Sequence, residues 1–281
     1  MTRPPAGPKR MVGNRSFLGT RLSHGAALSL VLLLTTACST VPETGRRQLS
    51  ILPSSVEAQQ GTLAFNQFKS RNRVSGDPAA NAKVRRVGGR IAAAVNRPDI
   101  HWEFAVLIDP TPNASALPGG KVIVNTGLLA LVGNDAELAA IVGHEIGHVM
   151  ARHGSERQSQ AIVAALGGSV LDAALQTSGI PGVSRQLLSG AYGTGAKVGV
   201  LLPYHRRHES EADRLGLIYM ARAGYDPEAA LTIWRKLAAY SKRQGADMTP
   251  PILRTHPVDE QRIANIQKYL PEAAANKPSD S

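Results

Sequence analysis

The pentapeptide His144-Glu145-Ile146-Gly147-His148 has the HExxH pattern, whose residue types can build a hydrolytic metal site. In a helix, four residues turn the chain by about 400°, so His144 and His148 share a face roughly 6 Å apart along the axis. Two imidazoles in this arrangement can bind one zinc ion. Glu145 lies about 100° around the helix and can take a proton from a zinc-bound water, whose pKa falls toward about 7. The spacing predicts a water activated to attack a carbonyl.

A catalytic zinc needs a third protein ligand, and its fourth position stays open for water. A third histidine in the metzincin arrangement would fall at position 154, where the chain has Gly154, so that solution is excluded. The other solution is a carboxylate from a later helix. In HESEADRLG, Glu209 and Asp213 share a helix face, so Glu209 could bind the metal while Asp213 orients an imidazole. Periodicity does not separate Glu209 from Glu211, and a solvated charged face is the alternative interpretation.

The elements that must position these residues are mostly helical. Capping residues, prolines at helix starts and apolar residues at spacings of three and four indicate helices. They are expected over residues 54–72, from 78 to near 98, and over 134–153, 206–223, 226–243 and 257–269. Residues 160–200 are rich in Ala, Gly and Ser and predict a loose helical hairpin with a Gly/Pro tip.

Two strands are expected early in the chain. Residues 101–108 alternate in polarity, and the short segment Lys121–Asn125 contains three successive β-branched residues, Val122, Ile123 and Val124. The stretch between them is rich in Pro and Gly and is expected to break the sheet. The pattern predicts an α+β fold that is predominantly helical, with a small sheet and an active-site HExxH helix.

Three further motifs accompany HEIGH. They are the ExxxD pair Glu209 and Asp213, the tripeptide Thr255–Pro257, and NASALPGG at residues 113–120. With TGRRQLSIL at residues 44–52, these motifs resemble the HtpX/BepA/Oma-type zinc metallopeptidases, relatives of the CAAX prenyl endopeptidase, and in particular their lipoprotein members. Ser115 stands where that family usually has Phe. The resemblance covers nearly the whole mature chain and implies a gluzincin-like metallopeptidase domain with one zinc ion.

The resemblance also implies roles for individual residues. Glu209 would be the third zinc ligand, and Asp213 would support the site and act as a proton donor. His256 would lie near the zinc, where it either stabilises the oxyanion or blocks the metal in a resting state. Arg262 would stabilise the developing negative charge. Without the resemblance, the residues alone predict that His256 caps a helix and that Arg262 lies on a solvent-exposed helix face.

Substrate is expected to bind as an added strand. The segment Lys121, Val122, Ile123, Val124 and Asn125 directly precedes the metal-helix region, and we expect it to be the open sheet edge. Main-chain pairing there would align an extended polypeptide with little demand on its side chains. The predicted function is a zinc endopeptidase acting on unfolded or misassembled envelope proteins. The alternative is a membrane-tethered, metal-binding chaperone or assembly factor with latent protease activity.

The N-terminus predicts export. A basic leader, the apolar run AALSLVLLL at residues 26–34 and small residues after it are typical of a signal peptide over residues 1–37. Cys38 follows directly, in the place of a lipobox cysteine, although Thr35 stands where that pattern prefers Leu. We expect a lipid-anchored protein at the periplasmic face of the outer membrane; a simple cleaved signal and a soluble periplasmic protein are the alternative.

The expected organisation of the rest of the chain is a tether or loop over 38–53, the metallopeptidase domain over 54–270 and a flexible tail over 271–281.

Composition excludes several other classes. The chain has 281 residues, 43% of them hydrophobic and 19% charged, which argues against a disordered polymer. Its net charge is +11, but only 4% of residues are aromatic and no basic stripe is interleaved with them, so nucleic acid is not an expected partner. One cysteine excludes a disulfide framework.

Among the remaining histidines, His101 and His153 are expected to be structural, and His205 and His208 to contact solvent or loops.

Overall fold

The computed structural model describes residues 38–196, 202–245 and 249–278. The predicted signal peptide, residues 1–37, and residues 279–281 of the predicted tail lie outside the described residues. In chain order the elements are β1 (Cys38–Thr40), β2 (Arg47–Leu49), α2 (Ser54–Arg71), α3 (Pro78–Val95), β3 (Glu103–Leu107), β4 (Ala114–Leu117), β5 (Lys121–Asn125), α4 (Thr126–Leu129), α5 (Asp135–Met150), α6 (His153–Thr177), α7 (Gly182–Ala196), α8 (Leu202–Arg222), α9 (Ala229–Gln244), α10 (Pro251–Thr255) and α11 (Glu260–Ala274). The predicted α+β fold, dominated by helices, is confirmed.

Helices α3 and α5 each start at a capping residue that is recognisable in the sequence. Asp77 caps α3 by accepting hydrogen bonds from the amides of Ala79 and Ala80, and Pro78 takes the first helical position. Asn134 caps α5 by accepting a hydrogen bond from the Glu137 amide at 2.9 Å. Both helix starts agree with the sequence prediction.

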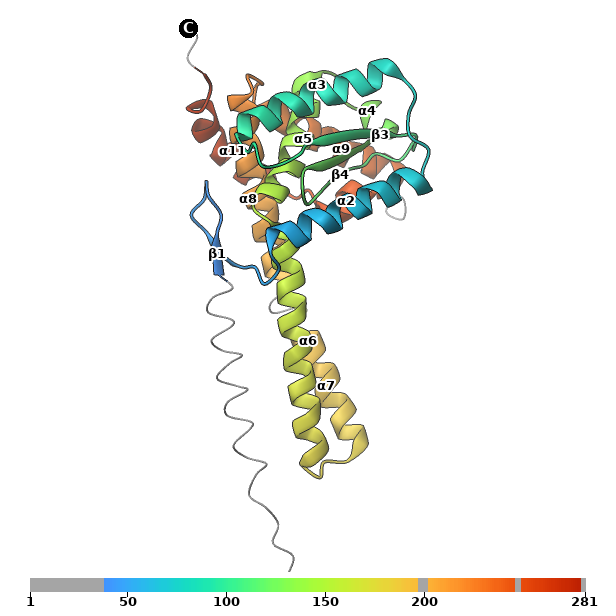
Figure 1. The fold of residues 1–281 in the computed structure, drawn as a ribbon, viewed down its shortest axis with the longest axis vertical. Helices are drawn as coiled ribbons and strands as arrows, with labels where there is room; N and C mark the ends of the chain where they lie inside the picture. Colours follow the sequence, from blue (N-terminus) through green and yellow to red (C-terminus); the bar gives the residue numbers. More distant parts are fainter. Residues whose placement is uncertain (1–37, 197–201, 246–248, 279–281) are drawn as a thin grey trace, which may run out of the picture. The chain divides into compact units, whose positions relative to one another are not determined.

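The three-stranded sheet has the order β3-β5-β4, with β3 parallel and β4 antiparallel to β5 (Figure 1). The central strand is therefore Lys121–Asn125, buried along its whole length. The expectation that this segment is the open edge is wrong. β4, Ala114–Leu117, pairs with the edge of β5 that β3 does not occupy. The sequence predicts only a break in the sheet between Pro110 and Gly120, but this stretch holds a short strand. An uninterrupted buried strand is typical of a sheet centre.

The metal-motif helix α5 packs most closely on α8, because glycines bring the two backbones together. A Cβ on Gly147 would lie 2.7 Å from the Ala212 carbonyl oxygen, and one on Gly216 would lie 2.7 Å from the His144 amide nitrogen. Neither position has room for a methyl group. This close approach places the two histidines of α5 against the acidic residues of α8.

Replacing Gly216 by alanine should destabilise the protein, although alanine is the better helix former by about 1 kcal/mol. The added methyl would push α8 away from α5, and such overpacking typically costs about 1–3 kcal/mol. We expect a fall of several degrees in Tm by thermal denaturation. Gly89 in α3 is the matched control, because a Cβ there meets nothing within 4 Å. An equal Tm for Gly216→Ala and Gly89→Ala would contradict the close-packing account.

Residues predicted as a tether or loop contain instead a small sheet formed by β1 and β2. Val41 lies in the hydrophobic core with 0% exposure, and the Gln48 side chain is buried. The segment is ordered because it buries an apolar side chain and, as described below, pairs its arginine with buried carboxylates. The expectation of a loop over 38–53 is therefore wrong for β1 and β2.

The predicted flexible tail begins too early. The last helix, α11, continues through Pro271 to Ala274, and Ala273 is fully buried. Glu272 accepts two hydrogen bonds at 2.7 Å from Arg214 of α8, so both apolar packing and an ion pair fix this turn.

The helical hairpin expected over 160–200 is confirmed up to Ala196: α6 and α7 lie side by side and turn at Gly179, which has a φ of +72° (Figure 1). Among the described helices, none is both long and apolar enough to cross a membrane.

Candidate metal centre

Four side chains converge at the middle of α5. His144 and His148 come from α5, Glu209 from α8, and His256 from the residue that ends α10. One donor atom of each lies within 4.8 Å of the others, and all but His256 are buried. The structure thus brings together the three predicted metal ligands with a fourth candidate ligand.

The spacing of the three predicted ligands fits a tetrahedral cation. The His144 Nε2 and His148 Nε2 atoms are 3.1 Å apart, and they lie 3.4 Å and 3.3 Å from the Glu209 carboxylate oxygens. A zinc ion with ligand distances of about 2.0–2.1 Å would separate its ligands by about 3.3 Å. Two imidazole nitrogens at this distance either share one hydrogen or bind a common cation. The donor set therefore fits zinc.

Glu211, the other carboxylate that periodicity allowed, does not join this cluster. It accepts hydrogen bonds from Arg46 and pairs with His153 instead. The choice of Glu209 as the third ligand thus agrees with the geometry.

Asp213 orients the first imidazole. Its Oδ1 atom lies 2.8 Å from His144 Nδ1, which donates the hydrogen bond and leaves Nε2 facing the cluster. Burial would lower the pKa of His144, but the Asp213 carboxylate raises it to about 9, so this site attracts positive charge. Burial lowers the pKa of His148 to about 3, which keeps that ring neutral, as a metal ligand must be. Burial opposes ionisation of Glu209, yet hydrogen bonds from the histidines around it hold its pKa far below the ordinary range.

Arg262 supports Asp213 from behind. Its Nε and Nη2 atoms donate to the two carboxylate oxygens of Asp213 at 2.8 Å, and its Nη1 donates to the carbonyls of His256 and Pro257. The guanidinium also stacks on Trp234, with 3.9 Å between Cζ and the ring centroid. Arg262 is 6% exposed, so the alternative prediction that it lies on a solvent-exposed helix face is wrong. Because its donors are engaged, it holds Asp213 and the His256 loop rather than the substrate.

The same contacts argue against a proton-donor role for Asp213. Burial opposes its ionisation, but the charges of Arg262 and His144 hold the pKa of Asp213 below its ordinary range. An ionised carboxylate at neutral pH has no proton to give. Its role in this structure is to orient His144.

Glu145 borders the cluster without belonging to the ligand set. Its Oε2 atom accepts a hydrogen bond from the Ala116 amide of β4 at 3.1 Å. Its Oε1 atom is buried, has no hydrogen-bond partner among the described residues and lies 3.3 Å from His256 Nε2. A buried carboxylate with one free oxygen beside a metal cluster is suited to take a proton from a bound water.

The predicted substrate strand does not reach the cluster with its side chains. Lys121 donates to the His101 carbonyl and pairs with Glu103, and Asn125 hydrogen-bonds Asp109. The residue that borders the centre from the sheet is instead Ala116. Its contribution is a backbone amide, so no side-chain pattern in the sequence could have indicated it.

Two further histidines lie close to the cluster: the surroundings of His208 differ from the expectation, and those of His153 agree with its expected structural role. His208 is 1% exposed and lies 2.9 Å from a Glu156 oxygen, so the expected contact with solvent or loops is wrong. His153 is fully buried and lies 2.8 Å from His148. Their spacing to Glu156 and Glu211 on neighbouring helices depends on tertiary packing, which the sequence pattern does not contain.

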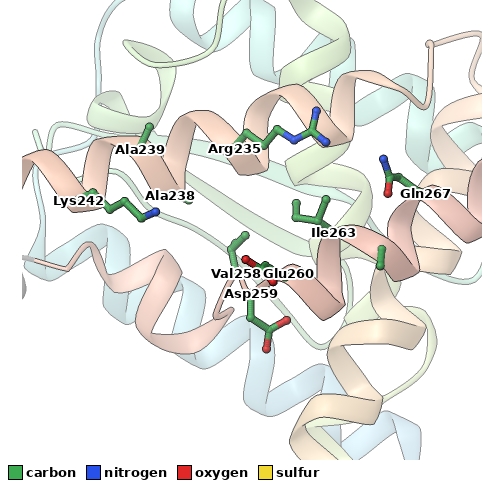
Figure 2. Close-up of a pocket in the computed structure, with 10 residues that line it drawn as sticks. Arg235, Ala238, Ala239, Lys242, Val258, Asp259, Glu260, Ile263 and Gln267 are labelled. Atoms are coloured by element: carbon green, nitrogen blue, oxygen red, sulfur yellow. The ribbon is translucent and has the colours of Figure 1, made fainter.

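A separate hollow of about 500 Å³ lies between α9 and α11 (Figure 2). Ala238 and Ile263 are among its apolar lining residues. Arg235 and Lys242 line it from α9, and Asp259 and Glu260 from the start of α11 (Figure 2). None of the four candidate ligands lines it.

Comparison with known proteins agrees with this geometry. Residues 78–270 match the model of peptidase family M48. The mitochondrial metalloendopeptidase OMA1 of Schizosaccharomyces pombe is 34% identical over 244 residues, which cover 84% of this chain and 68% of that protein. The beta-barrel assembly-enhancing protease of Escherichia coli K12 is 30% identical over 241 residues, covering 82% of this chain and 47% of that protein. The putative protein of that name from Vibrio cholerae is 32% identical over 235 residues, with shares of 81% and 47%. The chain thus spans about half to two thirds of the length of these relatives.

Proposed function

The chain belongs to peptidase family M48 and carries the His-His-Glu metal site of a metalloendopeptidase, and from this premise we propose that it is a zinc-dependent endopeptidase of unfolded or misassembled envelope proteins. The observation that carries the proposal is the free Oε1 atom of Glu145, buried beside three converging ligands. A site that only stored metal would not need this carboxylate.

Each residue then has a defined task. When bound, zinc lowers the pKa of a water molecule toward about 7 and polarises the scissile carbonyl. Glu145 would take a proton from the attacking water through Oε1 and return it to the leaving amine. The Ala116 amide holds the other oxygen of Glu145 in place. Asp213, itself fixed by Arg262, keeps His144 Nε2 directed at the cluster.

The substrate would add along β4, an edge strand of the three-stranded sheet. In the register of β4 with β5, Asn113 accepts a hydrogen bond from the Asn125 amide. Since the amides alternate along a strand, those of Ala114 and Ala116 point away from β5, and Ala116 does reach Glu145. An extended polypeptide beside β4 would therefore lie next to the catalytic carboxylate. Main-chain pairing of this kind favours unfolded chains.

Cleavage of one protein in two states tests this substrate preference. We expect reduced, carboxymethylated α-lactalbumin to be cut at least about tenfold faster than the native, disulfide-bonded form, because only the unfolded chain can present an extended segment to β4. Fragment formation is followed by mass spectrometry, with the Glu145→Gln variant as control. Equal rates for the two forms would contradict the proposed substrate class.

The proposed location is the periplasmic face of the outer membrane, with a lipid anchor on Cys38. It is supported by the apolar run at residues 26–34 and the position of the cysteine directly after it. Expression with a labelled fatty acid should yield a labelled protein, and Cys38→Ala should abolish the label. A protein that is unlabelled but cleaved near this point would favour the soluble periplasmic alternative.

A second candidate function is a metal-binding chaperone with latent protease activity, and the position of His256 favours it. His256 Nδ1 lies 3.1 Å from His144 Nε2 and 2.9 Å from a Glu209 oxygen, where a fourth metal ligand would be expected. A histidine in that position would exclude the catalytic water. The protease would then be active only when the loop after α10 moves.

Replacing His256 by alanine should therefore raise the rate of casein cleavage several-fold, because the fourth metal position becomes free for water. The rate is measured with zinc-saturated protein, and His101→Ala serves as the control for an exposed histidine. A large loss of activity would instead assign His256 to the stabilisation of the oxyanion. Unchanged activity would mean that His256 does not occupy the metal.

A further inference from the structure

The second metal-ligand imidazole has a support that the sequence does not reveal. His144 contacts its carboxylate, Asp213, directly. Among the described residues, no carboxylate contacts Nδ1 of His148 in this way; that atom lies 2.8 Å from Nδ1 of His153, the first residue of α6. His153 Nε2 in turn lies 2.9 Å from Glu211 Oε2 on α8. A line of hydrogen bonds thus leads away from the metal cluster through two imidazoles to a carboxylate.

The direction of these hydrogen bonds follows from the acceptor at the end. The Glu211 oxygen that pairs with Arg46 accepts, so His153 Nε2 carries a hydrogen and donates it. The Nδ1 atom of the neutral His153 ring then accepts from His148 Nδ1. This leaves the lone pair of His148 on Nε2, the atom that faces His144 and Glu209. Glu211 thereby sets the tautomer of a metal ligand that it does not touch.

The N-terminal segment between β1 and β2 holds Glu211. Arg46 donates from Nε to Glu211 at 2.7 Å, and Thr44 donates from its hydroxyl to the other carboxylate oxygen. The remaining nitrogens of Arg46 donate to Glu156 of α6 at 3.0 Å and 2.8 Å. Arg46 is 16% exposed, while Glu156 and Glu211 are 2% and 8% exposed. One guanidinium therefore pairs with two buried carboxylates and joins the N-terminal segment to the two helices beside the metal site.

We propose that the β1–β2 segment is a structural component of the metal centre: Arg46, through Glu211 and His153, positions His148 for metal binding. His153 is a positioning residue that acts through His148. The protein consequently depends on residues 44–46 for its metal affinity, although they precede the part of the chain, residues 78–270, that matches the family model.

The proposal rests on the proposed zinc site, and its test measures metal binding rather than proteolysis. The zinc Kd is determined by competition with a chromophoric chelator for the wild type and for His153→Phe, His153→Gln, Arg46→Gln and Arg214→Gln. Outer partners of metal ligands typically contribute 10–100-fold in affinity. We expect His153→Phe to weaken zinc binding by about that factor, and Arg46→Gln to weaken it by a smaller factor because the Thr44 hydroxyl remains.

His153→Gln distinguishes positioning from simple packing. A glutamine can accept a hydrogen bond through its carbonyl and donate one through its amide, so it should recover most of the affinity that phenylalanine loses. Arg214→Gln is the matched control, because it removes a two-fold ion pair of α8 with Glu272 outside the network. It should lower stability without changing the zinc Kd.

Unchanged zinc affinity in Arg46→Gln and His153→Phe would overturn the proposal. So would equal losses in His153→Gln and His153→Phe. If His153→Phe does not fold, Arg46→Gln alone decides, because Arg46 lies at the surface end of the network. A wild-type protein that binds no zinc would instead refute the proposed function itself.

Discussion

Replacing Glu145 by glutamine is expected to lower kcat for casein cleavage by about 10²–10⁴-fold, the usual contribution of a general acid–base group. Glutamine has nearly the same shape and can keep the hydrogen bond from the Ala116 amide, but it cannot take a proton from water. Glu145 is not among the metal ligands, so bound zinc should stay at the wild-type amount. The rate is measured with zinc-saturated protein, and the metal by elemental analysis.

Glu228→Gln, at an exposed position before α9, is the matched control and should retain full activity. If Glu145→Gln cleaves casein at the wild-type rate, another group must activate the water. If zinc is bound but no condition produces Glu145-dependent cleavage, the chaperone reading is favoured over the enzyme.

Replacing Arg262 by methionine should destabilise the metal-free protein by about 3–5 kcal/mol, the usual effect of breaking a buried ion pair. Asp213 is 3% exposed, and without the guanidinium its negative charge would lack its strongest partner. Adding Asp213→Asn to this variant removes that charge and should recover part of the loss. The free energy of unfolding is measured by urea denaturation in the presence of a chelator, so that metal binding does not contribute.

The destabilisation should depend on pH. Arg262 helps to hold the folded-state pKa of Asp213 below its value in the unfolded chain, about 3.9. A lowered carboxyl pKa contributes stability that is complete above the unfolded pKa and is lost as the pH falls through the folded one. The difference between wild type and Arg262→Met should therefore be full near pH 7 and shrink below about pH 4. Arg254→Met, at an exposed position, is the control; a difference independent of pH would mean that packing on Trp234, not charge, dominates.

The helices and the two histidine ligands could be predicted because their signals are local. Asn134 and Asp77 cap helices through the next three residues, and the spacing of His144 and His148 fixes their common face. The third ligand could not be chosen from periodicity, because Glu209 and Glu211 are both buried on α8. Which of them meets the metal depends on how α8 lies against α5, and the resemblance to a known family supplied that answer.

The order of the strands could not be predicted in the same way. β4 is a short strand of small residues between a proline-rich turn and two glycines, and its pairing with β5 is a tertiary contact. One signal did exist: β5 is a continuous apolar run, which favours a central strand over an edge. The link from Arg46 to His148 passes through residues from four separate segments, so no spacing within the sequence could indicate it.

The most direct test is a crystal structure with anomalous scattering data collected at the zinc absorption edge. We predict one strong peak about 2.0–2.2 Å from His144 Nε2, His148 Nε2 and a Glu209 oxygen, with Glu145 outside the coordination sphere. A metal bound by Glu211 or His153 instead, or a protein saturated with zinc that gives no peak between α5 and α8, would contradict the account.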